Sequence, residues 1–308
     1  MLKSLRPASF PRHISILVLL TVGTCFASAH ISARISFDHN TGLLTAVLFR
    51  SAITAMVLAI AIVMRRQSIG LAKNQIGWQL LLGLLIASQS ISIYSAVSRI
   101  PVGIALLVVN TFPVWLALIT WALGGRRPAL RVSLIMGAII IGLLLALDIP
   151  SRLNEPAGDI QQWLAGIGFA LLASVSFAVG LWVMEHKTPT INGTVRSLYT
   201  MIVVFICAWL AGEVGMIANG MALPSSIVGW LSLSILSVLY AGAFTLLFIL
   251  APRLDMSQNA PAMNIEPIAS LALGWIILGQ ALTPIQIVGG VTVVAGIVVL
   301  AYTKQSSH

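Results

Sequence analysis

Two stretches of this chain decide its fold: RIPVGIALLVVNTFPVWLALITWALGG at residues 99–125 and RLDMSQNAPAMNIEPIASLALGWIILG at residues 253–279. The second repeats the first at a fixed offset of 154 residues without a gap, and Tyr94 against Phe248 extends the register. The identical pairs are Arg99 and Arg253, Asn110 and Asn264, Pro113 and Pro267, Trp121 and Trp275, Gly125 and Gly279, and Gly142 and Gly296. Because these residue types are rare in apolar sequence, the match indicates a duplicated membrane unit.

The composition of the whole chain is that of a membrane protein. Of 308 residues, 58% are hydrophobic and 8% are charged, whereas soluble domains carry about 25% charged residues. Ten runs of roughly 20 apolar residues are long enough to cross a bilayer as helices. They lie at about 14–35, 43–64, 77–97, 102–123, 132–148, 162–184, 196–217, 227–250, 260–279 and 285–302.

The basic residues predict the topology of these spans. With the N-terminus in the cytoplasm, thirteen of the seventeen basic residues fall in cytoplasmic segments, as the positive-inside rule requires. The outer loop between the fifth and sixth spans carries Asp148, Glu155 and Asp159 instead. The net charge of +9 is therefore explained by the basic residues of the cytoplasmic segments. A nucleic-acid partner is not expected, because the chain has no clustered basic stretch.

Each half of the chain holds five spans, an odd number, so the second half must enter the membrane in the opposite orientation to the first. The predicted fold is an all-α integral membrane protein of ten transmembrane helices, arranged as two inverted five-helix repeats. Its predicted parts are a cytoplasmic tail (1–13), the first repeat (14–148), an outer linker (149–161), the second repeat (162–302) and a cytoplasmic tail (303–308).

An alternative interpretation of the N-terminus stays open. Basic residues precede an apolar core, and Ala27-Ser28-Ala29 resembles a signal-peptidase site. Cleavage there would leave nine spans and break the symmetry of the two halves. The cysteines, Cys25 and Cys207, both lie inside predicted spans, and neither a disulfide framework nor metal-ligand spacing is present. No cofactor and no metal are expected.

The prolines in the two repeated stretches predict helix kinks. Pro113 cannot donate to the carbonyl of Val109, nor Pro267 to that of Met263, so these acceptors need other partners. Asn110 and Asn264 each stand three residues before their proline. They either satisfy the kinked backbone or also face a substrate at the repeat interface, where carriers of this kind bind their solutes.

Two charged residues, Arg50 and Glu266, stand out well away from the ends of predicted spans, where charge is costly and usually functional. Glu266, next to Pro267, is a candidate for proton or cation coupling, with a permanent structural ion pair as the alternative. Arg50 is the matching cation in the second span, and it contacts either substrate or an interface. An ion pair between Glu266 and Arg50 also remains open.

Other polar residues are arranged on helix faces. Ser88, Ser92 and Ser95 recur with Arg99 on one face of the third span, which predicts either a cavity wall or a helix-packing seam. Further candidates for lining a cavity are His30, Gln89, Tyr94, Trp182, Tyr240 and Asn259. Small residues at Ala138, Gly142, Thr292 and Gly296 predict close packing of spans five and ten as scaffolding or dimerising helices.

Nearly the whole chain resembles the drug/metabolite transporter superfamily, and within it the ten-helix EamA type. The matching motifs are Arg50-Ser51, Tyr94-Ser95-Ala96, Thr111-Phe112-Pro113-Val114, Ile265-Glu266-Pro267 and Leu278-Gly279. The segment after residue 280 is similar to that of the threonine/homoserine exporters. One departure is Gln280, where many relatives have glutamate, and this counts against coupling through a carboxylate at that position.

The resemblance implies a carrier rather than an enzyme, in the cytoplasmic (inner) membrane with both termini inside. It would export a small polar metabolite such as an amino acid, driven by protons or by the solute's own gradient. Its partners would be the solute, the lipid bilayer and protons, and it would act as a monomer or homodimer. Two alternatives remain: export of cationic drugs, and a scaffold subunit without transport activity.

Overall fold

The computed structural model describes residues 10–125, 127–148, 157–250, 253–254 and 260–305. Every regular element among them is helical. The elements are α1 (Arg12–Asp38), α2 (Leu43–Met64), α3 (Lys73–Val97), α4 (Val102–Val109), α5 (Phe112–Ala122), α6 (Leu130–Leu147), α8 (Ala157–His186), α9 (Gly193–Glu213), α10 (Ile227–Leu250), the 3-10 helix η2 (Ala260–Asn264), α12 (Ile265–Leu278) and α13 (Pro284–Gln305).

The helices follow the predicted spans closely. In the part of the chain that the structure describes, eight helices are long and apolar enough to cross a membrane, with α4 and α5 counted together, and two shorter apolar helices follow at 262–278 and 284–300. The first repeat consists of α1, α2, α3, the α4–α5 pair and α6. The second consists of α8, α9, α10, the η2–α12 pair and α13. The all-helical ten-span prediction is confirmed.

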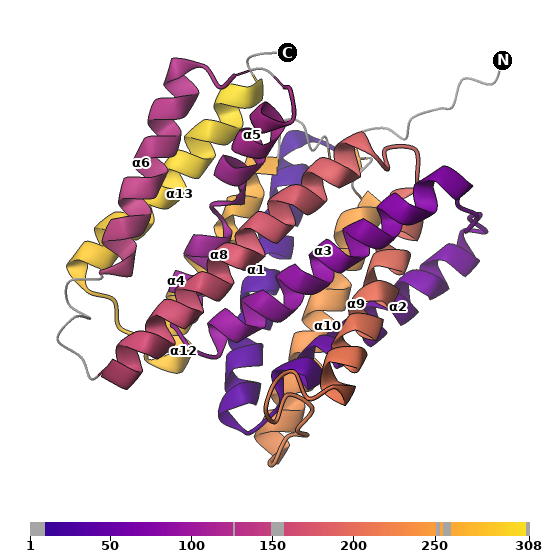
Figure 1. Ribbon diagram of the computed structural model, residues 1–308, viewed down its shortest axis with the longest axis horizontal. Coiled ribbons are helices and arrows are strands. Elements are labelled where there is room, and N and C mark those ends of the chain that lie inside the picture. The colour runs from indigo at the N-terminus through magenta and orange to yellow at the C-terminus, as the bar shows by residue number, and fades with distance from the viewer. Residues whose placement is uncertain (1–9, 126, 149–156, 251–252, 255–259, 306–308) are drawn as a thin grey trace.

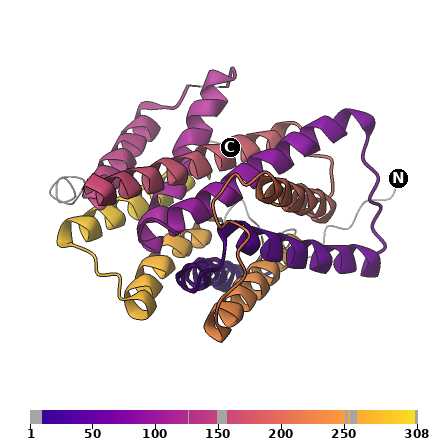
Figure 2. The same ribbon diagram turned by 60° about the horizontal axis from the view of Figure 1, so that its bottom comes forward.

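The two repeats pack against each other symmetrically. The contact of α1 with α10 has its counterpart in α8 with α3, and that of α1 with α12 in α8 with α5. Three contacts join equivalent helices: α2 with α9, α4 with α12, and α6 with α13. The α6–α13 and α2–α9 pairs lie on opposite sides of the bundle (Figures 1 and 2). This exchange of roles is what an inverted repeat requires.

The chain departs from a continuous α-helix just before both prolines, at the two positions where the sequence predicts kinks. In the first repeat α4 ends at Val109 and α5 starts at Phe112. In the second repeat η2 ends at Asn264, and α12 starts at the next residue. The prolines stand at the start of the continuing helix, Pro113 within the first two positions, where a missing N–H costs nothing. Each break therefore leaves its backbone open at mid-helix without straining the second half.

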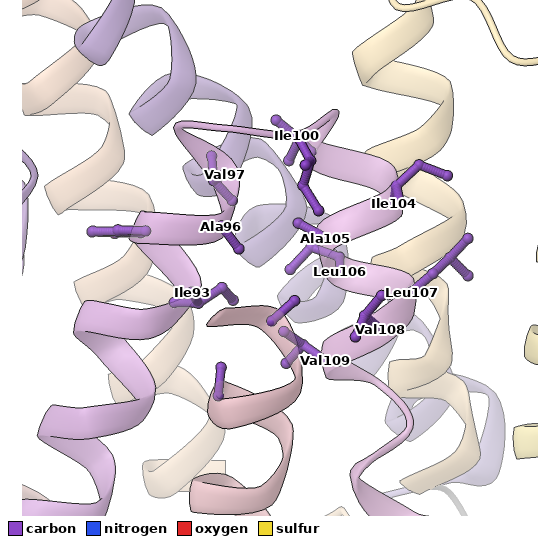
Figure 3. Packing of buried hydrophobic residues seen from close by; sticks show 14 of the residues in the cluster. Ile93, Ala96, Val97, Ile100, Ile104, Ala105, Leu106, Leu107, Val108 and Val109 are labelled. Atoms are coloured by element: carbon purple, nitrogen blue, oxygen red, sulfur yellow. The ribbon is translucent and has the colours of Figure 1, made fainter. Parts of the chain in front are cut away.

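Helix α4 lies at the centre of the bundle. All eight of its residues are buried. Figure 3 shows Ala105 and Leu106 on the side of α4 that faces α3, and Ile104 and Leu107 on the opposite side. By contrast, α5 keeps only Val114 and Ala117 buried. The α4 half of the broken span is thus firmly packed, while the α5 half is held mainly against α8.

Small residues bring α6 and α13 together. A Cβ added to Gly142 would lie 2.8 Å from Thr292 Cβ, and one added to Gly296 would lie 2.5 Å from Ile139 Cγ1. Both are closer than side chains normally approach, so only glycine allows this spacing. The predicted close packing of spans five and ten occurs within one chain. Their role in dimer formation stays a prediction.

Helix α1 starts and helix α13 finishes on the same side of the bundle, which we call the terminal end (Figure 1). On the opposite side, which we call the distal end, hydrogen bonds join the two repeats. At the distal end Gly42 N donates to Ala222 O (2.8 Å) and Leu44 N to Gly220 O (2.9 Å). Gly42 sits so close to Gly220 that an added Cβ would lie 2.2 Å from its carbonyl oxygen. The first and second repeats are therefore locked to each other at this end.

Candidate functional site

Polar side chains from five helices meet inside the bundle. They are His30 of α1, Arg50 of α2, Ser90 and Tyr94 of α3, Tyr240 of α10 and Glu266 of α12. We call this set the central cluster. It joins residues from both repeats, as expected of a solute site in a carrier built from inverted repeats.

Arg50 is buried in the central cluster together with Ser90 and Tyr94. Its side chain is 1% exposed, and its Nη2 donates to Ser90 Oγ at 2.6 Å. The guanidinium carbon lies 4.1 Å from the centre of the Tyr240 ring and 4.9 Å from that of Tyr94. Arg50 Nε has no hydrogen-bond partner among the described residues. The charge is therefore held by two aromatic faces and one hydroxyl.

Glu266 pairs with a histidine rather than with Arg50. Its Oε1 lies 3.7 Å from His30 Nε2, and the side chains are 19% and 6% exposed. The His30 ring in turn meets Tyr94 edge to face, with centroids 5.9 Å apart. His30 Nδ1 finds no partner in the described part of the chain. Tyr94 thus stands between the Glu266–His30 pair and Arg50.

A glycine on α1 permits the contact between His30 and Glu266. Gly23 lies two turns before His30, on the same face of the helix. A Cβ on Gly23 would come within 2.5 Å of Ile265 Cγ2 and 3.3 Å of Met263 O. The α1 backbone therefore packs directly on the second helix break, and this close approach brings His30 to the carboxylate.

The first helix break has different chemistry at the matching positions. Asn110 Nδ2 donates to Leu106 O (2.8 Å), within its own helix. Thr111 Oγ1 pairs with Ser174 Oγ of α8 (3.2 Å). Phe112, which matches Glu266 in the repeat alignment, packs edge to face on Phe177 with centroids 4.8 Å apart. Asn110 thus satisfies the backbone, and this break is neutral.

The serine stripe of α3 faces α8 instead of the central cluster. Ser88 Oγ lies 3.1 Å from Ser176 Oγ, and the Arg99 guanidinium lies 5.0 Å from the Phe169 ring. Ser92 and Ser95 are buried between these two points on the same face. The stripe is therefore part of a helix–helix contact, and lining of a transport path by it stays a prediction.

The remaining predicted residues lie in different places. Gln89 accepts a long hydrogen bond from Ser90 (3.4 Å) at the edge of the central cluster. Trp182 stacks on His186 near the terminal end, with ring centroids 4.8 Å apart. Asn264 is half-buried at the second break. Asn259 lies outside the described residues, as do Arg152 and Glu155.

Gln280 closes the distal end. Gly279, with φ of 63°, ends α12 in the left-handed conformation, which glycine adopts without strain. The turn brings Gln280 Oε1 within 3.1 Å of Val102 N at the start of α4. Gln280, which is neutral, thus caps helix α4 of the first repeat.

Sequence comparison assigns this architecture to a family. The model of the EamA-like transporter family matches residues 13–147 and 163–302. The chain belongs to this family. It is a multi-pass membrane protein, and each half of this EamA-family transporter carries one of the matched regions.

This EamA-family chain also has a relative among curated proteins. It is similar to the uncharacterized transporter sll1319 of Synechocystis sp., with 26% identity over 240 residues, which cover 73% of this chain and 66% of the relative. The match thus spans just under two thirds of that relative's length. One solved crystal structure matches the EamA-family chain with a TM-score of 0.61 at 18% identity, covering 96% of this chain and 99% of its own. At that identity the likeness shows the fold alone.

Two members of the site escaped the sequence analysis. Ser90 stands one turn before Tyr94, on the face next to the serine stripe. This four-residue spacing to Tyr94 is the sequence signal that could have identified Ser90 as part of the site. Gly23 lies in an apolar run where glycine is common, and nothing local marks it. Only the packing of α1 on η2 and α12 gives it a role.

Proposed function

We propose that this protein exports a small polar metabolite of the amino-acid class across the cytoplasmic membrane, with both termini inside, by alternating access coupled to protons. The observation that carries the proposal is the Glu266–His30 contact, with the two side chains 3.7 Å apart at a helix break between the repeats. Acidic and histidine side chains inside a membrane commonly relay protons in transporters.

The two ends of the bundle support alternating access. At the distal end α4 is fully buried, and Gln280 and Gly42 bond across the repeats. Towards the terminal end α5 is loosely packed, and Glu266 retains 19% exposure. A carrier closed at one end and looser at the other needs only to exchange the packing of its two repeats to reverse access.

The test is efflux of a labelled amino-acid panel from vesicles that hold the purified protein, with and without an imposed pH gradient. We expect at least one amino acid to leave faster with the gradient. The Glu266→Gln variant should lose this dependence on pH, because an amide does not take up a proton. Equal efflux from protein-free vesicles, or gradient dependence unchanged in Glu266→Gln, would reject the proposal.

A panel of cationic dyes in the same vesicles tests the main alternative. Phe26 and Phe244 pack on Tyr240 of the central cluster and form an aromatic group with it, which favours flat cationic solutes. The buried positive charge of Arg50 disfavours them. Movement of the dyes without movement of amino acids would replace amino-acid export by drug export.

A further inference from the structure

We propose that Arg50 is a carboxylate receptor, so that the transported solute carries a carboxylate that binds the guanidinium in place of Tyr240. The inference deepens the proposed function and rests on it for the identification of the ligand as a transported solute. It commits to a chemical class and to one binding group. It also gives Tyr240 a role, as the ring that the carboxylate displaces.

The first argument is that Arg50 lacks an anionic partner. No carboxylate of the described residues lies within 4.0 Å of it, since Glu266 is taken by His30 and the other ion pair joins Arg34 to Asp38. A guanidinium out of water needs compensation by an opposite charge and by hydrogen bonds to its N–H groups. Here Ser90 and two rings supply only part of that compensation.

The second argument is that several buried polar atoms around Arg50 have no partner. Arg50 Nε, Tyr94 Oη and His30 Nδ1 are buried without hydrogen bonds in the described part of the chain. The three side chains touch one after another: Arg50 contacts Tyr94, and Tyr94 contacts His30. Buried polar groups in proteins are normally satisfied. Unpaired polar atoms on side chains that touch one another favour the binding of a polar ligand beside Arg50.

The third argument concerns which of the two rings can leave. Tyr94 is fully buried and fixed between His30 and Phe37. Tyr240 is half-buried, stands 4.1 Å from the guanidinium carbon and meets the rings of Phe26 and Phe244. It also packs on the buried side chains of Val22 and Ala243. A ring face is a weaker partner for a guanidinium than a carboxylate that accepts two of its hydrogen bonds. Tyr240 is therefore the group that a carboxylate would displace.

The chemistry of the ligand follows from this arrangement. A planar guanidinium with a free Nε matches the two oxygens of a carboxylate. Beyond the Tyr94 ring, Glu266 lies 3.7 Å from His30, and a cationic group of the same solute would bind the Glu266 carboxylate in place of His30. A zwitterion satisfies both positions, whereas a solute with only positive charge would face Arg50 without compensation.

The experiment measures thermal unfolding of the purified full-length protein in detergent at constant ionic strength. The probes are the twenty amino acids, acetate and propionate, each compared with the amide that replaces its carboxylate. A ligand that binds the folded state raises the Tm, by a few degrees at about ten times its Kd. We expect at least one carboxylate to raise the Tm of the wild type while its amide does not.

Three variants assign the shift to Arg50. Arg50→Gln should abolish it, and Arg50→Lys should reduce it at least several-fold while retaining the charge, because lysine lacks the Nε and the planar fork. Arg99→Gln is the matched control. It removes an exposed arginine that also lies on a ring, that of Phe169, and should leave the shift unchanged. If Arg50→Gln fails to fold, Arg50→Lys and the pairs of carboxylate and amide still decide the question.

The outcomes separate this inference from the proposed function. Equal shifts for every carboxylate and its amide, or a shift that persists in both Arg50 variants, would overturn the carboxylate receptor even if vesicles transport a solute. A carboxylate-specific shift lost in the Arg50 variants, together with no efflux of any solute, would retain the receptor and reject the transport proposal.

Discussion

The two helix breaks of this protein share their geometry and differ in their chemistry. Asn110 and Pro113 at the first break match Asn264 and Pro267 at the second. Between them the first repeat has Phe112 packed on Phe177, whereas the second has Glu266 beside His30. Duplication has thus preserved the asparagine and the proline, while the two residues between them have diverged. The comparison teaches that the symmetric part of the fold is the hinge and that the charge belongs to one repeat only.

The largest effect is expected from neutralising the charged break. Glu266→Gln keeps the size of the side chain but removes its charge and its pairing with His30. Because an amide cannot take up and release a proton, we expect transport driven by a pH gradient to fall by about tenfold or more, which corresponds to about 1.4 kcal/mol. Efflux rates from vesicles at several imposed gradients give the measurement.

The matched control for this change is Phe112→Leu at the neutral break. It keeps an apolar side chain at the position equivalent to Glu266 and should retain gradient dependence. If Phe112→Leu abolishes the dependence as completely as Glu266→Gln does, the breaks do not differ in function and the comparison fails.

The next largest effect is expected where α1 packs on the charged break. Gly23→Ala places a Cβ against Ile265 Cγ2, and overpacking of this kind costs about 1–3 kcal/mol. We expect a Tm lowered by several degrees and weaker transport, because α1 carries His30 away from Glu266. Thermal unfolding and efflux of the variant provide the two readouts.

A second substitution sharpens this prediction. Ile265→Ala removes the methyl group that the new Cβ meets, so the double variant should regain much of the Tm lost by Gly23→Ala. Additive losses in the double variant would show that the close approach of Gly23 to Ile265 is not what positions α1.

A smaller effect is expected at the distal end of the second broken span. Gln280→Ala removes the acceptor for Val102 N, a loss of about 1 kcal/mol, which corresponds to a roughly fivefold shift between conformations. We expect single cysteines placed in the 39–42 turn to react faster with a water-soluble thiol reagent. Gln280→Glu, which keeps an acceptor, should be labelled at the same rate as the parent protein. Unchanged labelling of Gln280→Ala would show that Gln280 does not help to close the distal end.

The smallest effect is expected on the α3–α8 face, away from both breaks. Ser88→Ala removes one hydrogen bond to Ser176, and interhelical bonds of this type contribute about 0.6 kcal/mol on average. Efflux rates should change by less than about threefold, since this energy corresponds to such a factor. A much larger loss would place the serine stripe in the transport path after all.

Much of the fold is readable from the chain because its signals are local. Apolar length fixes each span, and a proline in an apolar run removes a backbone donor wherever the helix lies, so the breaks at Pro113 and Pro267 follow from sequence. The repeat offset then pairs the halves. The candidate residues His30, Arg50, Tyr94, Tyr240 and Glu266 were also selected for being polar or aromatic in apolar surroundings.

The grouping of these residues was not readable in the same way. Two groups of residues on α3 follow the same helical spacing. The serine stripe faces α8, whereas Ser90 and Tyr94 face Arg50. Periodicity identifies a face but not the neighbour that it meets. The partner of Glu266 likewise depends on how closely α1 approaches α12, which is set by Gly23 and Ile265 together.

The sequence by itself determined that this protein is a bundle of ten membrane spans in two inverted halves, with a break in the fourth and ninth. These properties depend on hydrophobic length, charge asymmetry and proline, each of which acts within one segment. Only the tertiary structure decided that Glu266 meets His30, that Arg50 lies against two tyrosine rings, and that Gln280 closes the distal end. Such contacts join segments far apart in the chain, and they depend on distances between helices that no single segment encodes.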